Sequence, residues 1–301
     1  MVYLLGNQET KALFYGLAAV LCWSTVATAF KIALRELDTF QLVFFANLTA
    51  ASFLLSIISV RGDFSRALIV FKTHWRLTLI AGVLNPVIYY LILFQAYELL
   101  PAQVAMSINY TWAIVLSFMA VFFLGQRLVL ADGIAALVCY SGVFIIATGG
   151  QLHSFSQAGL KGLGLALFST VIWAGYWTLS IADKREPVIG LALNFIIALP
   201  LTAGICAAFS GFSLAFDGLI AATYIGVVEM GVAFLLWSVA LNLSTNASRV
   251  SNLIFLSPFI SLVLISQVLG EEISSSTFLG LILIIAGLVY QQKAHSQGSG
   301  T

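Results

Sequence analysis

The chain has 301 residues, of which 61% are hydrophobic and only 8% are charged, whereas an ordinary soluble domain carries roughly 25% charged residues. So few charges do not cover the surface of a water-soluble fold, but a bilayer removes that requirement because each helix satisfies its own backbone polar groups. The net charge of +1 gives no support to nucleic-acid binding. We therefore expect an all-α integral membrane protein.

Apolar runs long enough to cross a bilayer follow one another along the chain. A spanning helix needs roughly 20 residues at a rise of about 1.5 Å each. The ten candidates are residues 12–34, 39–60, 76–98, 101–124, 131–149, 162–182, 188–210, 217–241, 247–269 and 275–291. No small-residue cleavage site follows the first run, so we interpret it as a retained transmembrane helix and not as a signal peptide.

The three cysteines, Cys22, Cys139 and Cys206, each fall within a predicted span and show no Cys-x-x-Cys spacing. This pattern is more typical of buried apolar thiols than of a disulfide or a metal site. We therefore expect neither a metal nor a cofactor.

The basic residues are distributed unequally between the two faces that ten spans define. Ten of the thirteen Lys and Arg fall on the face of the N-terminus, namely Lys11, Arg61, Arg66, Lys72, Arg76, Arg127, Lys184, Arg185, Arg249 and Lys293, and three, Lys31, Arg35 and Lys161, fall on the opposite face. Basic residues in short loops favour the cytoplasm. We expect a multi-pass protein of the cell membrane, such as a bacterial inner membrane, with both termini cytoplasmic.

The chain also matches itself in blocks of Gly, Trp and charged residues. Trp23 falls on Trp173 and Arg35-Glu36 on Arg185-Glu186 at a shift of 150, Gly82 on Gly226 at 144, and Leu124-Gly125-Gln126 on Leu269-Gly270-Glu271 and Gly142 on Gly287 at 145. Chance coincidence among Leu-rich segments is the alternative, but the order and the near-constant shift argue against it.

The repeat predicts one transmembrane domain made of a first five-helix repeat over 12–149 and a second over 161–291, followed by a cytoplasmic tail, 292–301. Because five is odd, the second copy enters the membrane upside down. We therefore expect two inverted repeats, with substrate bound at their interface near mid-membrane.

Several of these residues resemble motifs of the drug/metabolite transporter superfamily, in its ten-helix EamA-like branch. They are Ala19 to Ala27 with Cys22-Trp23-Ser24, followed by Lys31; Ile172-Trp173-Ala174-Gly175-Tyr176-Trp177; and Ser257-Pro258-Phe259 through Leu269-Gly270-Glu271-Glu272 to Gly287. The first half departs from the pattern, with Ala113 in place of a proline and Gln126 in place of a glutamate. The resemblance covers residues 12–291, and the aromatic-rich interior is most similar to that of the YddG-like aromatic amino acid exporters.

Glu229 is the one acid near the centre of a predicted span, and ionisable groups within a bilayer are functional candidates. It is either a structural hydrogen-bond partner or a proton carrier or cation-binding group, because desolvation disfavours the charged form of a carboxyl. The repeat-related residue is the neutral Asn85. Pro86 and Pro258 each remove a helical hydrogen bond and predict bent gating helices, with kinks that have no function as the alternative.

Aromatic and amide residues cluster in the helices with which the resembled family lines its cavity. The candidate cavity residues are Trp23, Asn85, Tyr89, Tyr90, Asn109, Tyr110, Trp112, Trp173, Tyr176, Trp177, Glu229, Trp237 and Asn252. An interfacial aromatic belt is the alternative, and it suits Trp75, Tyr3 and Tyr290 better than the mid-helix rings. Arg249 is either a carboxylate partner or a cytoplasmic anchor.

An aromatic cavity with a few amides fits an apolar or aromatic solute that bears polar groups. Clusters of buried Lys or Arg, which phosphorylated solutes need, are missing from the spans. The sequence has no phosphate-binding loop and no H-E-x-x-H or G-x-S-x-G motif, so we do not expect an enzyme. We expect a secondary transporter that exports small apolar or aromatic amino acids; its alternatives are a transporter of drugs or other metabolites, a channel or an assembly protein. The expected partners are this solute and the lipid bilayer, with homo-oligomer formation left open.

Overall fold

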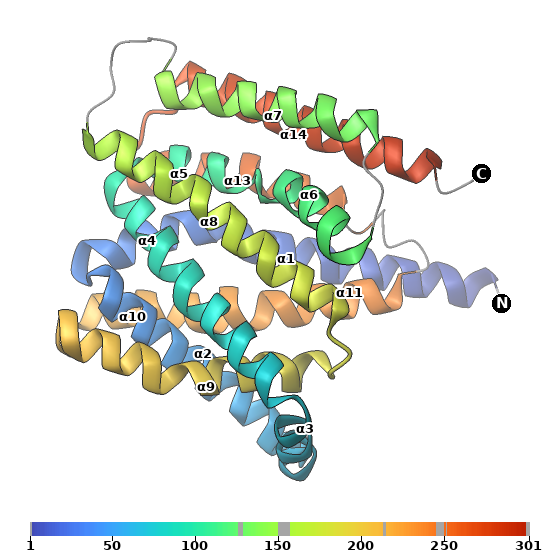
Figure 1. The fold of residues 1–301 in the computed structure, drawn as a ribbon, viewed down its shortest axis with the longest axis vertical. Helices are drawn as coiled ribbons and strands as arrows, with labels where there is room; N and C mark the ends of the chain where they lie inside the picture. Colours follow the sequence, from blue (N-terminus) through green and yellow to red (C-terminus); the bar gives the residue numbers. More distant parts are fainter. Residues whose placement is uncertain are drawn as a thin grey trace. The chain divides into compact units, whose positions relative to one another are not determined.

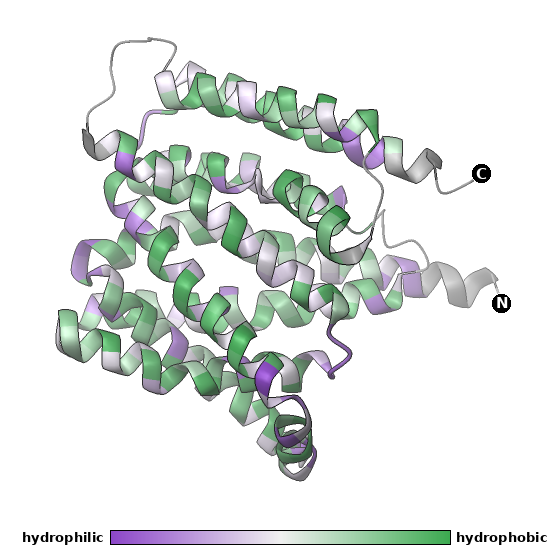
Figure 2. Cartoon of the chain, viewed as in Figure 1, coloured by the Kyte–Doolittle hydropathy of each residue, from purple (hydrophilic) through white to green (hydrophobic). Residues whose placement is uncertain are grey.

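The computed structural model describes residues 2–125, 129–149, 157–212, 215–244, 250 and 252–298, and every regular element within these ranges is a helix. Ten segments are long and apolar enough to cross a membrane, which confirms the predicted number of spans. They are Gln8–Glu36, Thr39–Arg61, Phe64–Leu99, Ala102–Phe123, Leu130–Thr148, Gly159–Ala182, Pro187–Phe209, Phe216–Leu243, Asn252–Leu269 and Ser275–Ala294. Figure 2 shows apolar residues along most of their length and hydrophilic residues mainly near helix ends.

The chain divides into two compact units, and each takes helices from both halves of the sequence (Figure 1). The first unit contains Met1–Leu91 and Lys184–Leu264, and the second contains Ile92–Asp183 and Ile265–Thr301. Within each unit, many partners are therefore far apart along the chain.

The first unit is built around the paired helices α2 and α9. Its elements are α1 (Val2–Glu36), α2 (Thr39–Arg61), α3 (Phe64–Gly82), η1 (Val83–Ile88), the start of α4 (Tyr89–Leu99), α9 (Pro187–Phe209), α10 (Phe216–Tyr224), η2 (Ile225–Ala233), α11 (Phe234–Leu243), η3 (Asn252–Leu256) and α13 (Ser257–Leu264). The Asp38 carboxylate caps α2 by accepting from the N–H groups of Phe40 and Gln41, and the Glu186 carboxylate caps α9 by accepting from that of Ile189. An acid at a helix N-terminus satisfies free N–H groups and complements the helix dipole.

The third helical segment begins earlier than the span predicted from residue 76. Helix α3 starts at Phe64, and its backbone leaves the helical region at His74 (φ −120°, ψ 27°). The turns before this break combine charged Arg66 and Lys72 with exposed apolar residues such as Leu68. A search for long apolar runs misses such a stretch because its charges lower the mean hydropathy.

Several spans of the first unit are not regular α-helices. The segments η1 and η2 are π-helical and η3 is a 3-10 helix. In η1, Asn85 has an extended backbone (φ −141°, ψ 113°) directly before Pro86. Pro258 lies in the first turn of α13, where η3 gives way to an α-helix. Short π-helical stretches in membrane helices often mark functional sites.

The second unit contains the closely packed pair α7 and α14, which Figure 1 shows side by side. Its elements are the rest of α4, α5 (Ala102–Asn109), α6 (Trp112–Leu124), α7 (Leu130–Thr148), α8 (Gln157–Ala182), η4 (Ile265–Leu269) and α14 (Ser275–Gly298). Two buried side chains join the pair, because the Gln291 amide donates to the Asp132 carboxylate at 2.7 Å. At the start of α5, the Glu271 carboxylate accepts from the N–H groups of Ala102 and Gln103, which gives the Gly270-Glu271 motif a structural role.

Two glycines make reciprocal contacts in the first unit. A Cβ at Gly82 would collide with the backbone carbonyl of Asn194 in α9, and a Cβ at Gly226 would collide with that of Ala46 in α2. Ala46 and Asn194 are each the eighth residue of their helix. Each half of the sequence thus supplies one glycine that packs against the equivalent position of a helix from the other half.

The second unit repeats this arrangement between α7 and α14. A Cβ at Gly142 would collide with the carbonyl of Gly280, and one at Gly287 would come close to the carbonyl of Ala135. Ala135 and Gly280 are each the sixth residue of their helix. Small residues let membrane helices approach closely.

Candidate functional site

A buried carboxyl in the first unit forms what we call the acid site, Glu229 with Tyr90. Glu229 lies in η2 and is 7% exposed. Its Oε1 accepts a hydrogen bond of 3.1 Å from the hydroxyl of Tyr90, which follows η1. Its Oε2 is buried and has no hydrogen-bond partner within the described ranges. The carboxyl therefore has one oxygen held by a hydrogen bond and one buried oxygen whose hydrogen-bonding capacity is unfilled.

Aromatic rings surround the donor of this hydrogen bond. The ring of Tyr90 packs edge-on against Phe30 of α1 at 6.4 Å between centroids, and against Tyr89 at 4.9 Å. All three side chains are buried. These contacts fix the direction from which the Tyr90 hydroxyl reaches Glu229.

Asn85 is fully buried in η1, and neither atom of its side-chain amide has a hydrogen-bond partner among the described residues. Buried polar groups are nearly always hydrogen-bonded, to protein or to water. This amide is therefore a second place in the first unit where a water or a ligand is expected. Pro86, beside it, is also buried.

Trp23 and Trp237 meet between α1 and α11. Their centroids are 5.3 Å apart, and Trp23 also packs edge-on against Phe234 at 5.8 Å. Both tryptophans are only partly buried. They offer an apolar surface in the same unit as the acid site.

Sequence reasoning missed a set of serines and a threonine that we call the hydroxyl strip, formed by Ser24 and Thr28 of α1 with Ser257 and Ser261 of α13. All four side chains are buried, and the Ser24 hydroxyl lies 3.2 Å from that of Ser257, to which it donates. The hydroxyls of Thr28 and Ser261 have no partner in the part of the chain that the structure describes. Their spacing of four residues within predicted spans was a usable signal, because residues four apart share one helix face.

The predicted rings of the second unit form what we call the aromatic cluster, Trp112, Trp173, Tyr176 and Trp177. Trp112 of α6 stacks on Trp177 at 6.1 Å, and Trp173 stacks on Tyr176 at 5.5 Å, with interplanar angles of 18° and 22°. Trp112 also meets Trp173 edge-on at 6.5 Å. The three tryptophans are partly exposed, so the cluster presents ring faces as well as packing internally.

The remaining candidates are more scattered. Asn109 donates to the hydroxyl of Ser169 at 3.0 Å, which joins α5 to α8, and Tyr110 lies in the turn after α5. Asn252 is exposed at the start of η3. Arg249 lies outside the described residues.

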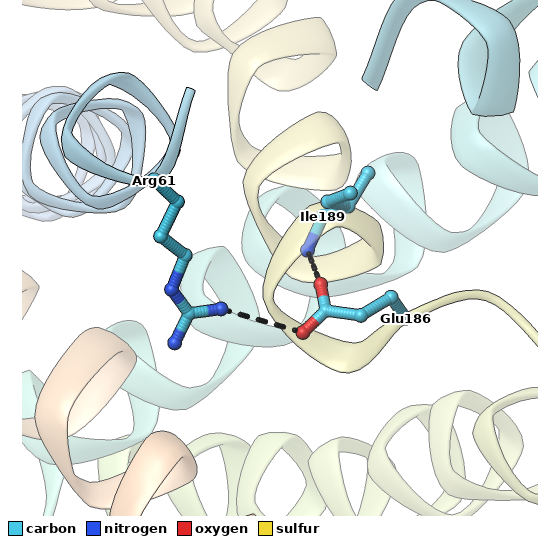
Figure 3. Close-up of polar contacts among 3 residues, drawn as sticks. All are labelled: Arg61, Glu186 and Ile189. Atoms are coloured by element: carbon cyan, nitrogen blue, oxygen red, sulfur yellow. Dashed lines mark hydrogen bonds and ion pairs between the residues drawn. The ribbon is translucent and has the colours of Figure 1, made fainter. Parts of the chain in front are cut away.

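Charged side chains mark one end of the α2–α9 pair. Figure 3 shows Arg61 of α2 reaching Glu186, the capping residue of α9, with 3.5 Å between Nη1 and Oε1. Arg185, which the sequence places among the loop charges, is instead buried and donates to Thr78 at 2.7 Å and to Asn194 at 3.1 Å. Thr78 is distant in the sequence, so the loop position of Arg185 did not reveal its burial.

The described residues contain no group of three His, Cys, Asp or Glu arranged to hold a metal ion. In the same ranges, the acid site, the Asn85 amide and the hydroxyl strip each leave at least one buried polar atom without a hydrogen-bond partner.

Comparison with known proteins finds similarity between this chain and transporters. The EamA-like transporter family matches residues 10–148 and residues 160–290. The uncharacterized transporter YvbV of Bacillus subtilis (strain 168) is 25% identical over 226 residues, which are 72% of each chain. An uncharacterized transporter of Archaeoglobus fulgidus is 23% identical over 284 residues, covering 89% of this chain and 93% of that protein.

A solved structure titled only "Crystal structure of protein" has a TM-score of 0.63 to this chain and 20% sequence identity. The match covers 93% of this chain and 96% of the other. At this identity the similarity concerns the fold.

Proposed function

Since this chain belongs to the EamA-like transporter family, we propose that it is a secondary transporter that exports small, mainly apolar or aromatic amino acids, or related metabolites, by alternating access. The ten apolar helices make it a multi-pass membrane protein. The solute, the direction and the mechanism of transport are the proposed parts.

The observation that carries the proposed solute class is the aromatic cluster. Its partly exposed rings on α6 and α8 offer stacking faces within spanning segments, and aromatic faces attract apolar and aromatic ligands. An aromatic belt at the membrane surface would not need four rings packed against one another in two stacked pairs. Phosphorylated solutes remain disfavoured because the spans lack clusters of Lys or Arg.

Alternating access is supported by signs of an inverted repeat. The family matches the chain twice, over 10–148 and 160–290, and each unit contains a pair of reciprocal glycine contacts between the two halves. Two repeats that make equivalent contacts with each other can move in equivalent ways. Such movements would let the protein alternate between inward-facing and outward-facing states.

The proposed orientation follows from the distribution of basic residues, ten against three. In this orientation the protein lies in a bacterial inner membrane with both termini in the cytoplasm. Single cysteines at positions 64 and 296 should then react with an impermeant reagent only from the cytoplasm, and one at position 155 only from outside. Labelling of positions 64 and 155 from the same face would contradict the inverted repeat.

Counterflow in liposomes tests the transport proposal. Purified protein should exchange labelled Phe, Trp and Met with saturable kinetics, because a carrier binds one solute in each cycle. A neutral drug in the same assay tests the alternative solute class, drugs or other non-phosphorylated metabolites. Membership of the family supports this class equally well. Fluxes that do not saturate would indicate a channel, and no flux of any compound would contradict the proposed solutes.

A further inference from the structure

The third apolar segment is longer than a membrane crossing requires. Phe64–Leu99 has 36 residues, about 54 Å of helix, whereas a hydrocarbon core of about 30 Å needs only about 20 residues. Its first part, Phe64–Thr73, precedes the break in the backbone at His74, and we call it the leading segment. Ala67 is the one buried residue of this segment, and Leu68 is 61% exposed. The leading segment is therefore a helix of its own with little packing against the first unit.

Helix α9 provides a reference for the position of the break, because the second part of α3 packs along it. The Arg185 guanidinium donates to Thr78 at 2.7 Å, and a Cβ at Gly190 would lie 3.5 Å from its Cζ. Thr78 thus lies beside Gly190. One turn further along both helices, Gly82 packs against Asn194. Since the contacts advance together, α3 and α9 run in the same direction.

This register places the break at the ends of two spans. His74 lies eight residues before Gly82, and the capping residue Glu186 lies eight residues before Asn194 in α9. Because helices that run in the same direction rise equally per residue, His74 lies level with Glu186. Glu186 forms the ion pair with Arg61, the last residue of α2 (Figure 3). The break is therefore level with the end of α2 and the start of α9.

The leading segment consequently begins and ends at one membrane surface. Helices α2 and α9 are spans, so their joined ends mark that surface. A left-handed Gly62 (φ 69°) leads directly from α2 to Phe64. The leading segment is about 15 Å long, and it would carry His74 that far from the surface if it followed the direction of a span. Since His74 stays at the surface, the leading segment runs along the membrane.

The two sides of the leading segment differ in polarity. Phe64 and Leu68 are exposed and four residues apart, so they share one face. Arg66 and Thr73 are also exposed and lie on the opposite face. Ile69 is the exposed apolar residue that departs from this pattern. A helix along a membrane surface turns its apolar face toward the acyl chains and its polar face toward headgroups and water.

The charge of this stretch is almost entirely positive. Arg66, Lys72 and Arg76 are exposed, and Asp63 is the one acid between residues 62 and 77. None of these three basic side chains forms an ion pair with a residue that the structure describes. The Arg76 guanidinium lies 5.3 Å from the ring centroid of Trp75, and tryptophan is enriched at membrane interfaces. The basic groups thus lie at headgroup level without an acidic partner from the described residues.

We propose that residues 64–76 form an interfacial helix that binds the headgroups of anionic phospholipids. Arg66, Lys72 and Arg76 contact the headgroup phosphates, and the face of Phe64 and Leu68 enters the acyl-chain region. Charge complementarity and the level of the helix favour lipid over a soluble acidic protein, which would leave the apolar face without a partner. This inference concerns the bilayer and is independent of the proposed solute.

Lipid titration tests the basic contacts. We would measure the binding of phosphatidylglycerol and of phosphatidylcholine with the same acyl chains to the full-length protein by native mass spectrometry. The wild type should prefer phosphatidylglycerol. The combined variant Arg66→Gln, Lys72→Gln and Arg76→Gln should lose about fivefold in phosphatidylglycerol affinity for each residue, and therefore on the order of a hundredfold in total. Its affinity for phosphatidylcholine should not change.

A second combined variant controls for net charge. Lys11→Gln, Arg35→Gln and Lys161→Gln remove three exposed basic residues that lie outside the leading segment. This variant has the same charge as the first and should retain wild-type affinity for phosphatidylglycerol. Equal losses in the two combined variants would show that binding follows net charge, and would overturn the proposed site.

Spin labels test the position of the helix without removing any charge. Leu68→Cys and Thr73→Cys would be labelled in liposomes that contain phosphatidylglycerol, with the wild type as background because its own cysteines lie within spans. The label at Leu68 should collide mainly with oxygen, which concentrates in the acyl region, and the label at Thr73 mainly with a water-soluble nickel complex. Two water-exposed labels would overturn the inference, and so would dipolar coupling between Leu68 labels on two copies of the chain.

These outcomes are separate from those of the transport assay. A wild-type protein that binds both lipids equally would overturn the interfacial helix and leave the transporter proposal standing. Preference for phosphatidylglycerol that depends on the three basic residues would support the helix even if counterflow contradicted the proposed solutes.

Discussion

The acid site and the aromatic cluster are assembled in different ways. Glu229 and Tyr90 are 139 residues apart, and their hydrogen bond exists because two interrupted helices meet inside the first unit. In the aromatic cluster, three of the four rings lie on one face of α8, because Trp173, Tyr176 and Trp177 are spaced i, i+3 and i+4. The polar site therefore depends on tertiary packing, whereas the aromatic site depends mostly on the periodicity of one helix.

The largest effect on folding is expected where a glycine allows two helices to approach closely, a kind of contact that each unit contains. Gly226→Leu and Gly142→Leu should each prevent correct folding, because the new side chain would overlap a backbone carbonyl of the neighbouring helix. Overpacking a tight interface costs about 1–3 kcal/mol or more. The measurement is the yield of monodisperse protein by size-exclusion chromatography.

Gly204→Leu and Gly133→Leu are the matched controls, since nothing lies within 4 Å of a Cβ at either position. Both should behave like the wild type. If only one of the two contact variants fails, the two units do not depend equally on close helix approach.

Tyr90→Phe tests the tertiary character of the acid site. It removes the donor to Oε1 of Glu229 and leaves a buried oxygen unsatisfied, which should lower the free energy of unfolding by about 1–3 kcal/mol. Thermal unfolding in detergent is the measurement. Tyr140→Phe, on the exposed face of α7, should be silent, and equal stability of both variants would mean that the hydrogen bond contributes nothing.

Trp112→Ala and Trp173→Ala test the aromatic cluster. Each removes ring contacts worth on the order of 1 kcal/mol beyond burial, so solute counterflow should fall roughly fivefold while the protein remains folded. Trp75→Ala, at an exposed tryptophan, is the control. Normal transport by both cluster variants would make these rings packing residues.

The smallest effect on stability is expected at the ion pair between Arg61 and Glu186. Arg61→Gln should lower the free energy of unfolding by only about 0.2–1 kcal/mol, because the Arg61 side chain is 48% exposed and water weakens the ion pair. The loss should be smaller in high salt, which screens exposed charges. Glu186→Ala should lower the free energy of unfolding by about 1 kcal/mol more than Arg61→Gln does, since it also removes the cap on the N–H of Ile189. Equal unfolding temperatures for both variants would assign Glu186 no capping role.

The sequence by itself determined the ten spans and the all-helical class, because hydropathy over some twenty residues is a local property. It also identified Glu229 as the acid inside a span and three ring positions on one face of α8. It misplaced the start of α3, where charged residues interrupt the apolar run before His74.

Tertiary structure alone decided which polar groups meet. Nothing near Glu229 in the sequence indicates Tyr90 as its donor, and the burial of Arg185 depends on Thr78 in another helix. The buried hydrogen bond from Ser24 to Ser257 likewise joins two helices that lie far apart in the sequence. Hydrophobic patterning decides that a helix enters the bilayer, but hydrogen bonds between helices depend on the direction and register in which those helices pack.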